Sequence, residues 1–292
     1  MKDYIITCTS TCDLTKELLE KRNIKYGKFK MSVNNVTYDD DFFDDYPYEK
    51  FYNDISAGMQ PTTSQVGFGE YVEMFEPYLI KGINILHLTL SSAISGDYAT
   101  CKSVADELNE KYEGKVYVLD TLGASSGYGM QVMMAADNKD NGMSFEDNIK
   151  YLEENKLHIH HWFISTDLSS YIRGGRISKT AGFFGTALKI CPLMNMPADG
   201  KLNPVEKIRT KTKAMEGQLN KMIELCEDGL NYSGRVYISQ SMMEEDVKQL
   251  SDKILETFKN VKSVEVFKIG TTIGAHTGPG TIALFFKGVK RV

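Results

Sequence analysis

The chain has 292 residues, of which 42% are hydrophobic and 25% are charged, and its formal net charge at pH 7 is −5. This composition is that of an ordinary globular protein with room for two domains. Nucleic-acid-binding proteins usually present a basic face, and the one basic run, at 207–213, is short, so we expect no nucleic-acid partner.

The first half of the chain alternates apolar runs with amphipathic segments. Runs rich in β-branched residues, each followed by a small polar turn, predict strands at 4–7, 83–90 and 116–119. Apolar residues at helical spacing predict helices at 14–21, 68–79, 98–112 and 145–155. Strands separated by helices indicate a parallel sheet with both faces covered.

Residues 28–60 interrupt this alternation of predicted strands and helices. Phe29, Met31 and Val33 alternate with polar residues, which predicts a small antiparallel insertion. The acidic and aromatic stretch that follows, YDDDFFDDYPYEKFY, is interpreted as a partly exposed loop. Its aspartates lack the spacing and the glycine of an EF-hand, which argues against a calcium loop at Asp39, Asp40, Asp41, Asp44 and Asp45.

The second half begins with a predicted strand at 162–165. It continues with predicted helices at 212–228 and 244–259 and predicted strands at 235–239, 264–269 and 281–286. The sequence therefore predicts an α/β fold of two domains. Residues 1–160 form an amino-terminal domain around a parallel sheet, with the insertion near 28–60, and residues 161–292 form a second α/β domain.

The amino-terminal sequence and the cysteines indicate the cellular compartment that we expect for the protein. The apolar stretch in MKDYIITCTS is too short for a signal-peptide core, and no run approaches the roughly 18 apolar residues of a membrane span. We therefore expect a cytoplasmic protein with no membrane span. An odd number of cysteines gives no disulfide framework and fits that compartment: Cys8, Cys12, Cys101, Cys191 and Cys226.

Metal ligands are not apparent in the sequence. Cys8 and Cys12 have no second Cys/His pair at zinc spacing. The cluster of His158, His160 and His161 alternates in a way that is typical of a strand edge. We expect no metal site.

Hydroxyl side chains follow each predicted strand of the parallel sheet. In such sheets ligands collect at the carboxyl ends of the strands, and Ser, Thr and free backbone N–H groups at helix starts can bind an anion. The segment PTTSQ (61–65) also precedes a helix and can cap it. One such turn would be ordinary helix capping, but several together favour a shared anion pocket: Thr9, Ser10, Thr11, Ser91, Ser92, Ser95, Thr121, Ser125 and Ser126.

His276 is the strongest single candidate for a ligand-binding residue. It lies in a predicted Gly-rich loop, Gly274-Ala275-His276-Thr277-Gly278-Pro279-Gly280, where backbone can approach a ligand closely. A histidine there can donate a hydrogen bond to a carboxylate or phosphate, although a structural role is also open.

The standard catalytic and nucleotide motifs are missing. The sequence contains no G-x-S-x-G elbow, no Walker A segment and no G-x-G-x-x-G between a strand and a helix. An enzyme, such as a small-molecule hydrolase or transferase that uses Ser95 or Thr63 with His276, remains the alternative. A sensor or transporter for another carboxylate or phosphate ligand is a third possibility.

At these turns the chain resembles the DegV family of bacterial fatty-acid-binding proteins, the lipid-carrying subunits of fatty acid kinase. The resemblance extends over essentially the whole chain. Its motifs occur in the family's order: PTTSQ, LSSAISGDY, DTLGASSGYG, IRGGRIS, RTKTKA and IGAHTGPG.

The resemblance implies a long-chain fatty acid whose acyl chain lies in an apolar tunnel between the two domains. A separate ATP-binding kinase subunit would phosphorylate the bound acid to an acyl phosphate for phospholipid synthesis, and this chain would perform no chemistry alone and need no cofactor. The positions that match the family's carboxylate ligands are Thr63, Ser95 and His276. Around them the resemblance adds Thr62, Ser64, Gly96 and Arg173, with Arg176 near the head group and the partner surface.

Two positions depart from the family pattern. Residues 8–14 read CTSTCDL where the family usually reads TDSTADL, so that Thr9 replaces an acidic residue. The family often has Lys-Pro where this chain has Cys191 before Pro192. These departures bear on the charge around the pocket and on the partner, and they leave Thr63, Ser95 and His276 intact.

Overall fold

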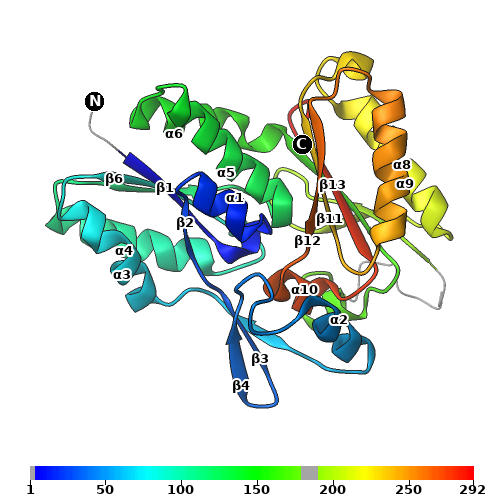
Figure 1. Ribbon diagram of the computed structural model, residues 1–292, viewed down its shortest axis with the longest axis horizontal. Coiled ribbons are helices and arrows are strands. Elements are labelled where there is room, and N and C mark those ends of the chain that lie inside the picture. Colours follow the sequence, from blue (N-terminus) through cyan, green and yellow to red (C-terminus); the bar gives the residue numbers. More distant parts are fainter. Residues whose placement is uncertain (1–3, 179–189) are drawn as a thin grey trace.

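The computed structural model describes residues 4–178 and 190–292, and its amino-terminal half contains a four-stranded parallel sheet (Figure 1). The strand order is β2-β1-β6-β7. β1 and β6 are buried along their whole length because helices cover both faces of the sheet. The strands are β1 (Tyr4–Thr9), β2 (Lys25–Gly27), β6 (Asn84–Thr89) and β7 (Val116–Asp120).

The helices of this half divide between the two faces of the sheet. Ile5 and Ile85 share a core with α3 and α4, whereas Ile6 and Leu86 share a core with α5 and α6. The predicted helices at 68–79 and 145–155 are confirmed at both ends, and the others begin or end within a few residues of the prediction. The helices are α1 (Lys16–Lys21), α3 (Phe68–Leu79), α4 (Asp97–Lys111), α5 (Ser125–Asp140) and α6 (Phe145–Asn155).

Helix α5 lies between the two large sheets. It packs against β1 on one side and against β8, β11 and β13 on the other, and a helix buried on all sides needs no polar face. Two glycines permit this packing: a Cβ on Gly127 would lie 2.4 Å from the Phe285 ring, and one on Gly129 would lie 2.6 Å from the Cys12 carbonyl oxygen. The GYG triplet is therefore a packing feature of this helix.

A six-stranded mixed sheet forms the carboxyl-terminal half, in the order β10-β9-β8-β13-β11-β12. Figure 1 shows α8 and α9 against its outer face, where they cover Ile282, Leu284 and Phe286. The alternate residues of β13 face inward. The elements are β8 (Ile159–Ser165), α7 (Ser169–Arg173), β9 (Leu193–Asn195), β10 (Asn203–Glu206), α8 (Lys211–Leu225), β11 (Arg235–Gln240), α9 (Glu244–Thr257), β12 (Ser263–Lys268), α10 (Thr271–Thr277) and β13 (Thr281–Lys287).

The strand β8 is longer than predicted and lies inside the sheet. It begins at Ile159 and pairs with both β13 and β9, so the interpretation of the histidine cluster as a strand edge was wrong. The α/β fold class is confirmed, with β8 as the first strand of the second large sheet along the chain. The domain boundary near residue 160 stays a prediction.

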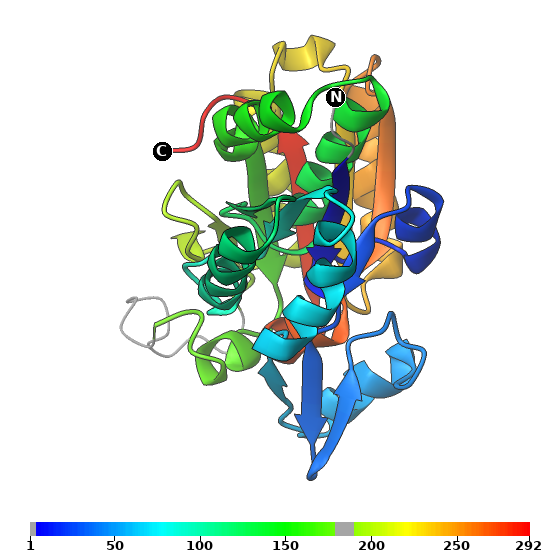
Figure 2. The same cartoon turned by 90° about the vertical axis from the view of Figure 1, so that its left-hand side faces the viewer.

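The insertion is an antiparallel sheet with a helix beside it. Its strand order is β4-β3-β5, and β3 and β4 form a hairpin that projects from the body of the molecule in both Figure 1 and Figure 2. The acidic aromatic stretch is not simply an exposed loop, because part of it forms α2 and Asp40 is only 2% exposed. The elements are β3 (Lys30–Val33), β4 (Val36–Asp39), α2 (Tyr48–Ser56) and β5 (Thr62–Ser64).

Candidate functional site

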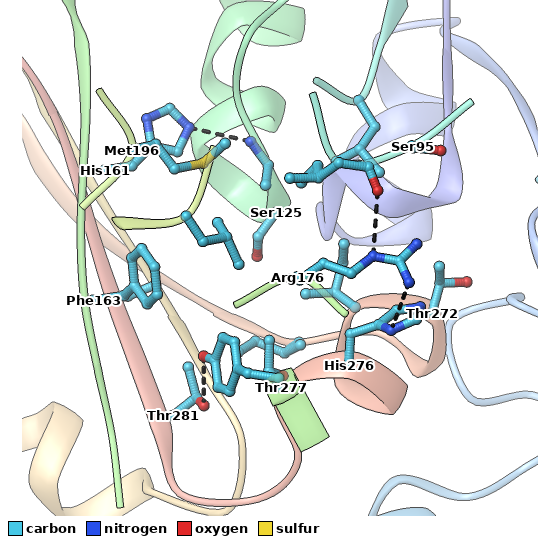
Figure 3. Close-up of a pocket in the computed structure, with 18 of the residues that line it drawn as sticks. Ser95, Ser125, His161, Phe163, Arg176, Met196, Thr272, His276, Thr277 and Thr281 are labelled. Atoms are coloured by element: carbon cyan, nitrogen blue, oxygen red, sulfur yellow. Dashed lines mark hydrogen bonds between the residues drawn. The ribbon is translucent and has the colours of Figure 1, made fainter. Parts of the chain in front are cut away.

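A pocket opens between the parallel sheet and the six-stranded sheet (Figure 3). The cavity has a volume of about 170 Å³ and opens to solvent at its mouth. Most of its walls are apolar: Phe29, Leu90, Ile94, Ala124, Phe163, Tyr171, Met196, Leu202, Ile269, Ile273, Ala283 and Phe285. A ligand here would bury most of its surface against hydrocarbon.

One end of the pocket carries a chain of hydrogen bonds centred on His276. The Arg176 Nη1 donates to His276 Nδ1 over 3.3 Å, and His276 Nε2 lies 2.7 Å from Thr63 Oγ1. Because Nδ1 accepts a bond from a guanidinium, the proton of the neutral imidazole is assigned to Nε2, which donates to Thr63. The hydroxyl hydrogen of Thr63 is then free to donate to a ligand.

His276 lies on the short helix α10, so its assignment to a loop was wrong. Two glycines make room around this helix. A Cβ on Gly174 would lie 2.4 Å from His276 Nδ1, and one on Gly274 would lie 2.4 Å from the Tyr52 hydroxyl. This explains why glycines accompany the histidine: they permit close packing.

Thr63 comes from β5 rather than from a helix cap. β5 pairs with β3, and the cap position of α3 is occupied by Gly67, so the prediction that PTTSQ caps a helix was wrong. Successive strand residues face opposite sides. Thr63 therefore points into the pocket, whereas Thr62 and Ser64 are exposed.

Ser95 and Gly96 line the same end of the pocket, in the turn before α4. The backbone N–H of Asp97 donates to Ser95 Oγ over 3.2 Å. With that lone pair occupied, the Ser95 hydroxyl can donate to an anion in the pocket. Asp97 is itself buried beside Tyr71, whose hydroxyl donates to its Oδ1 over 2.7 Å, and burial raises the pKa of the Asp97 carboxyl to about 7.

Arg176 makes this end of the pocket electropositive. Its Nε donates to the Ile94 carbonyl and its Nη1 to the Gly174 carbonyl as well as to His276. In the described part of the chain no carboxylate forms an ion pair with Arg176. A partly buried cation of this kind is favourably compensated by an anionic ligand.

The opposite side of the pocket is largely apolar, and His161 lies there among the apolar side chains. Figure 3 shows Phe163, Met196 and His161 on the side away from His276 and Arg176. His161 Nδ1 donates to the Ile159 carbonyl, and Nε2 accepts from the Ala124 N–H. Burial lowers the pKa of His161 well below its ordinary value, so the ring is neutral and has both nitrogens satisfied. It can line a tunnel for hydrocarbon.

The pocket thus brings together Thr63, Ser95, Gly96 and His276 but not three other predicted ligands. Thr62 and Ser64 face away from it. Arg173 is exposed, does not line the pocket, and donates from Nη2 to Ser170 Oγ. Sequence reasoning assigned no ligand role to His161 or Phe163, although their spacing of two residues on β8 places them on one face.

The idea of one anion pocket built from all the strand-end hydroxyls was too broad. Only Ser95 and Ser125 among them line the pocket. Most of the others are buried and bond internally: Thr9 with Thr11, Ser10 with Asp40, Ser91 with the Gly200 carbonyl, Thr121 with the Thr89 carbonyl, and Ser126 with Ser239. They hold the turns in place.

The two departures from the family pattern lie outside the pocket. Thr9 is buried, and its N–H donates to the Tyr128 hydroxyl over 2.9 Å. Cys191 is buried, and its burial raises the pKa of the thiol to about 11. Among the described residues no group of three His, Cys, Asp or Glu side chains could hold a metal ion. Within the same residues no helix is long and apolar enough to cross a membrane.

The geometry does not favour acyl or group transfer by this chain. A catalytic histidine needs a basic nitrogen toward the nucleophile and an acid that orients the other nitrogen. Here the other nitrogen faces a guanidinium, and burial together with Arg176 and Arg173 lowers the pKa of His276 to about 4. His276 is a weak base and a good neutral hydrogen-bond donor.

The lowered pKa of His276 can be measured. An NMR titration of the His276 ring is expected to give a midpoint near 4, and Arg176→Ala should move it upward, because burial is the largest cause of the shift and Arg176 the next. Since the folded-state pKa is depressed, the stability from a neutral His276 is complete above pH 6.5 and is lost as the pH falls through about 4. Lys248→Ala, at an exposed lysine on α9, serves as the control. A midpoint near 6.5 in the wild type would contradict the assigned contacts.

Comparison with known proteins matches residues 4–288 to the family model described as "Uncharacterised protein, DegV family". A DegV domain-containing protein of Clostridium perfringens is 34% identical over 289 residues, which cover 99% of this chain and 98% of that protein.

Solved structures share the fold. A fatty-acid-binding DegV family protein from Thermus thermophilus is 26% identical with a TM-score of 0.88, and the match covers 99% of this chain and all of that one. The Fak B3 protein of Streptococcus pneumoniae, a fatty acid kinase protein loaded with linoleic acid, has a TM-score of 0.83 over 98% of this chain and 99% of that one. At 19% identity the latter likeness concerns the fold alone.

Proposed function

We propose that this chain, which belongs to the DegV family, binds a long-chain fatty acid in the pocket between its two large sheets. The carboxylate would lie among Thr63, Ser95 and His276, and the acyl chain would extend toward Phe163, Met196 and Phe285. The single observation that carries the proposal is this polarity: hydrogen-bond donors lie at one end, together with Arg176, which has no carboxylate partner among the described residues, and hydrocarbon walls lie at the other.

The energetics support a fatty acid in such a pocket. About 14 methylenes of a sixteen-carbon acid at ~0.8 kcal/mol each offer on the order of 11 kcal/mol before the costs of association. The buried carboxylate needs hydrogen bonds, since an unsatisfied buried charge costs several kcal/mol. The hydroxyls of Thr63 and Ser95 and the nearby Arg176 satisfy this need. A small polar ligand would leave the apolar end unfilled.

The proposal includes a partner. The chain would present the carboxylate to a separate ATP-binding kinase subunit, which would phosphorylate it to an acyl phosphate, and the chain alone would have no enzymatic activity. Support comes from the family motifs, from a head-group end that carries no basic histidine, and from Arg176, whose charge could also stabilise a phosphoryl group. The domain boundary near residue 160 belongs to this proposal, since the ligand would lie between the halves.

The first experiment asks whether the purified protein carries fatty acid. Organic extraction followed by mass spectrometry is expected to release fatty acid in near-stoichiometric amount, and the delipidated protein should bind it again. A clean extract together with no binding of added palmitate or oleate would overturn the proposal.

A second assay separates carrier from enzyme. The protein with ATP and fatty acid should yield no acyl phosphate, detected as hydroxamate, until a kinase subunit of the same organism is added. Turnover of ester substrates by the protein alone, abolished in His276→Ala, would instead support a hydrolase.

A further inference from the structure

We propose that Asp13 and Asp40 are positioning residues that hold helix α10 so that His276 meets Thr63 at the head-group end of the pocket. The inference deepens the proposed function and rests on it for its meaning, but it can be tested in the ligand-free protein. Neither aspartate lines the pocket.

Asp40 accepts hydrogen bonds from Thr271, the first residue of α10. Its Oδ1 accepts from the Thr271 N–H over 3.2 Å and from Thr271 Oγ1 over 2.9 Å, and its Oδ2 accepts from Ser10 Oγ over 3.0 Å. The first N–H groups of a helix have no partner within the helix. A carboxylate at this place therefore fixes where α10 begins.

Asp13 accepts a hydrogen bond from Gly270, the residue that precedes α10. Its Oδ1 accepts from the Gly270 N–H over 3.0 Å, and its Oδ2 accepts from the Ser125 hydroxyl at the start of α5. Gly270 lies between the two carboxylates, since a Cβ there would lie 2.8 Å from Asp13 Oδ1 and 3.2 Å from Asp40 Oδ1. Two separate segments of the chain, which carry Asp13 and Asp40, thus converge on residues 270 and 271.

The link to the head group runs through the inserted sheet. Lys30 of β3 pairs with Asp39 of β4 on one side and with Ser64 of β5 on the other. Asp40 and Thr63 each adjoin one of these paired residues, so both are attached to the same short sheet. Asp40 therefore ties the sheet that carries Thr63 to the helix that carries His276, and α10 is only seven residues long, too short to absorb a displacement between them.

The carboxyl groups of Asp13 and Asp40 are both buried, and this burial costs free energy that their hydrogen bonds must offset. Asp13 is 4% exposed and Asp40 is 2% exposed, and among the described residues neither forms an ion pair. Burial raises the pKa of both carboxyls, and the proximity of Asp40 raises that of Asp13 further. Two adjacent buried carboxylates are unfavourable unless their hydrogen bonds are needed.

The test compares Asp40→Asn and Asp13→Asn with a matched control, Asp41→Asn. Asp41 is the next residue and is also buried, but its one hydrogen bond is to the Asp45 N–H over 3.4 Å, away from α10. The readouts are the NMR midpoint of His276 in the ligand-free protein and the ratio of affinities for palmitate and for hexadecanol.

In Asp40→Asn and Asp13→Asn the His276 midpoint is expected to move toward 6.5, and the palmitate-to-hexadecanol ratio to fall about fivefold or more, whereas Asp41→Asn should change neither. Thr271→Val, which removes one hydroxyl donor to Asp40, gives a milder variant if the aspartate variants fold poorly. An unchanged midpoint and an unchanged ratio in variants with a lowered Tm would overturn the inference and leave a structural role. If the wild type binds no palmitate, the proposed function fails, and the His276 midpoint alone still decides the positioning role.

Discussion

An Ala283→Phe variant is expected to bind palmitate about a hundredfold more weakly than the wild type. Thr281, Ala283 and Phe285 alternate on β13 and face the pocket, while the residues between them pack under α8 and α9. A phenyl ring at 283 would occupy the volume of about four methylenes of the tail. At ~0.8 kcal/mol for each buried methylene, this loss is roughly 3 kcal/mol, or about two orders of magnitude in Kd.

Chain length supplies the internal comparison. An eight-carbon acid would not reach the deep end of the pocket, so octanoate binding should change much less than palmitate binding. Ala99→Phe makes the same exchange at an exposed position on α4 and should leave both affinities unchanged. Thermal unfolding of each variant checks that the fold is kept. Equal palmitate affinity in Ala283→Phe and the wild type would show that the tail does not lie against β13.

Ser95→Ala is expected to weaken palmitate binding about 10- to 100-fold, because a hydrogen bond to a charged group contributes about 1.5–3 kcal/mol. His276→Ala should have an effect of similar size, because His276 Nε2 donates to Thr63 and leaves the Thr63 hydroxyl hydrogen free for the carboxylate. Thr63→Val should have a similar effect. His276 Nε2 and Thr63 Oγ1 are 2.7 Å apart and act as one unit. The double variant should therefore lose less than the product of the two single losses.

Neighbouring hydroxyls provide matched controls for the head group. Ser92 is exposed in the same turn as Ser95, and Thr62 is exposed on the same strand as Thr63. Ser92→Ala and Thr62→Val should bind palmitate like the wild type in a fluorescence displacement assay at pH 7. A loss in Thr62→Val equal to that in Thr63→Val would restore Thr62 as a ligand, and strict additivity in the double variant would argue against the coupled hydrogen bond.

Helices and strands whose apolar residues recur at regular spacing along the chain were predictable. Helices α3 and α6 each present an apolar stripe to one face of the parallel sheet, so their periodicity gives their bounds. Strands β1 and β6 are buried on both sides, so consecutive apolar residues such as Ile5 and Ile6 or Ile85 and Leu86 mark them in the sequence. In these cases local pattern and tertiary environment agree.

Elements held by distant contacts were not predictable. Helix α10 contains Gly274 and is flanked by Gly270, Gly278 and Gly280, which is typical of a loop. In the structure it is a helix whose start is held by hydrogen bonds to Asp13 and Asp40, and its Gly274 lies close to Tyr52. Likewise, the aspartates after β4 suggest an exposed acidic loop, yet Asp40 is buried, with partners from the turn after β1 and from α10.

The sequence by itself determined the family and the α/β class, and it singled out Thr63, Ser95 and His276, which all line the pocket, because each lies in a short motif whose order along the chain is visible. Only the tertiary structure decided that Thr62 and Ser64 face away, that most strand-end hydroxyls are bonded internally, and that His161 and Ala283 line the pocket. The physical reason is that the direction a side chain takes and the hydrogen bonds it makes depend on strand pairing and on partners elsewhere in the chain, some of them more than a hundred residues away. A one-dimensional pattern does not contain those contacts.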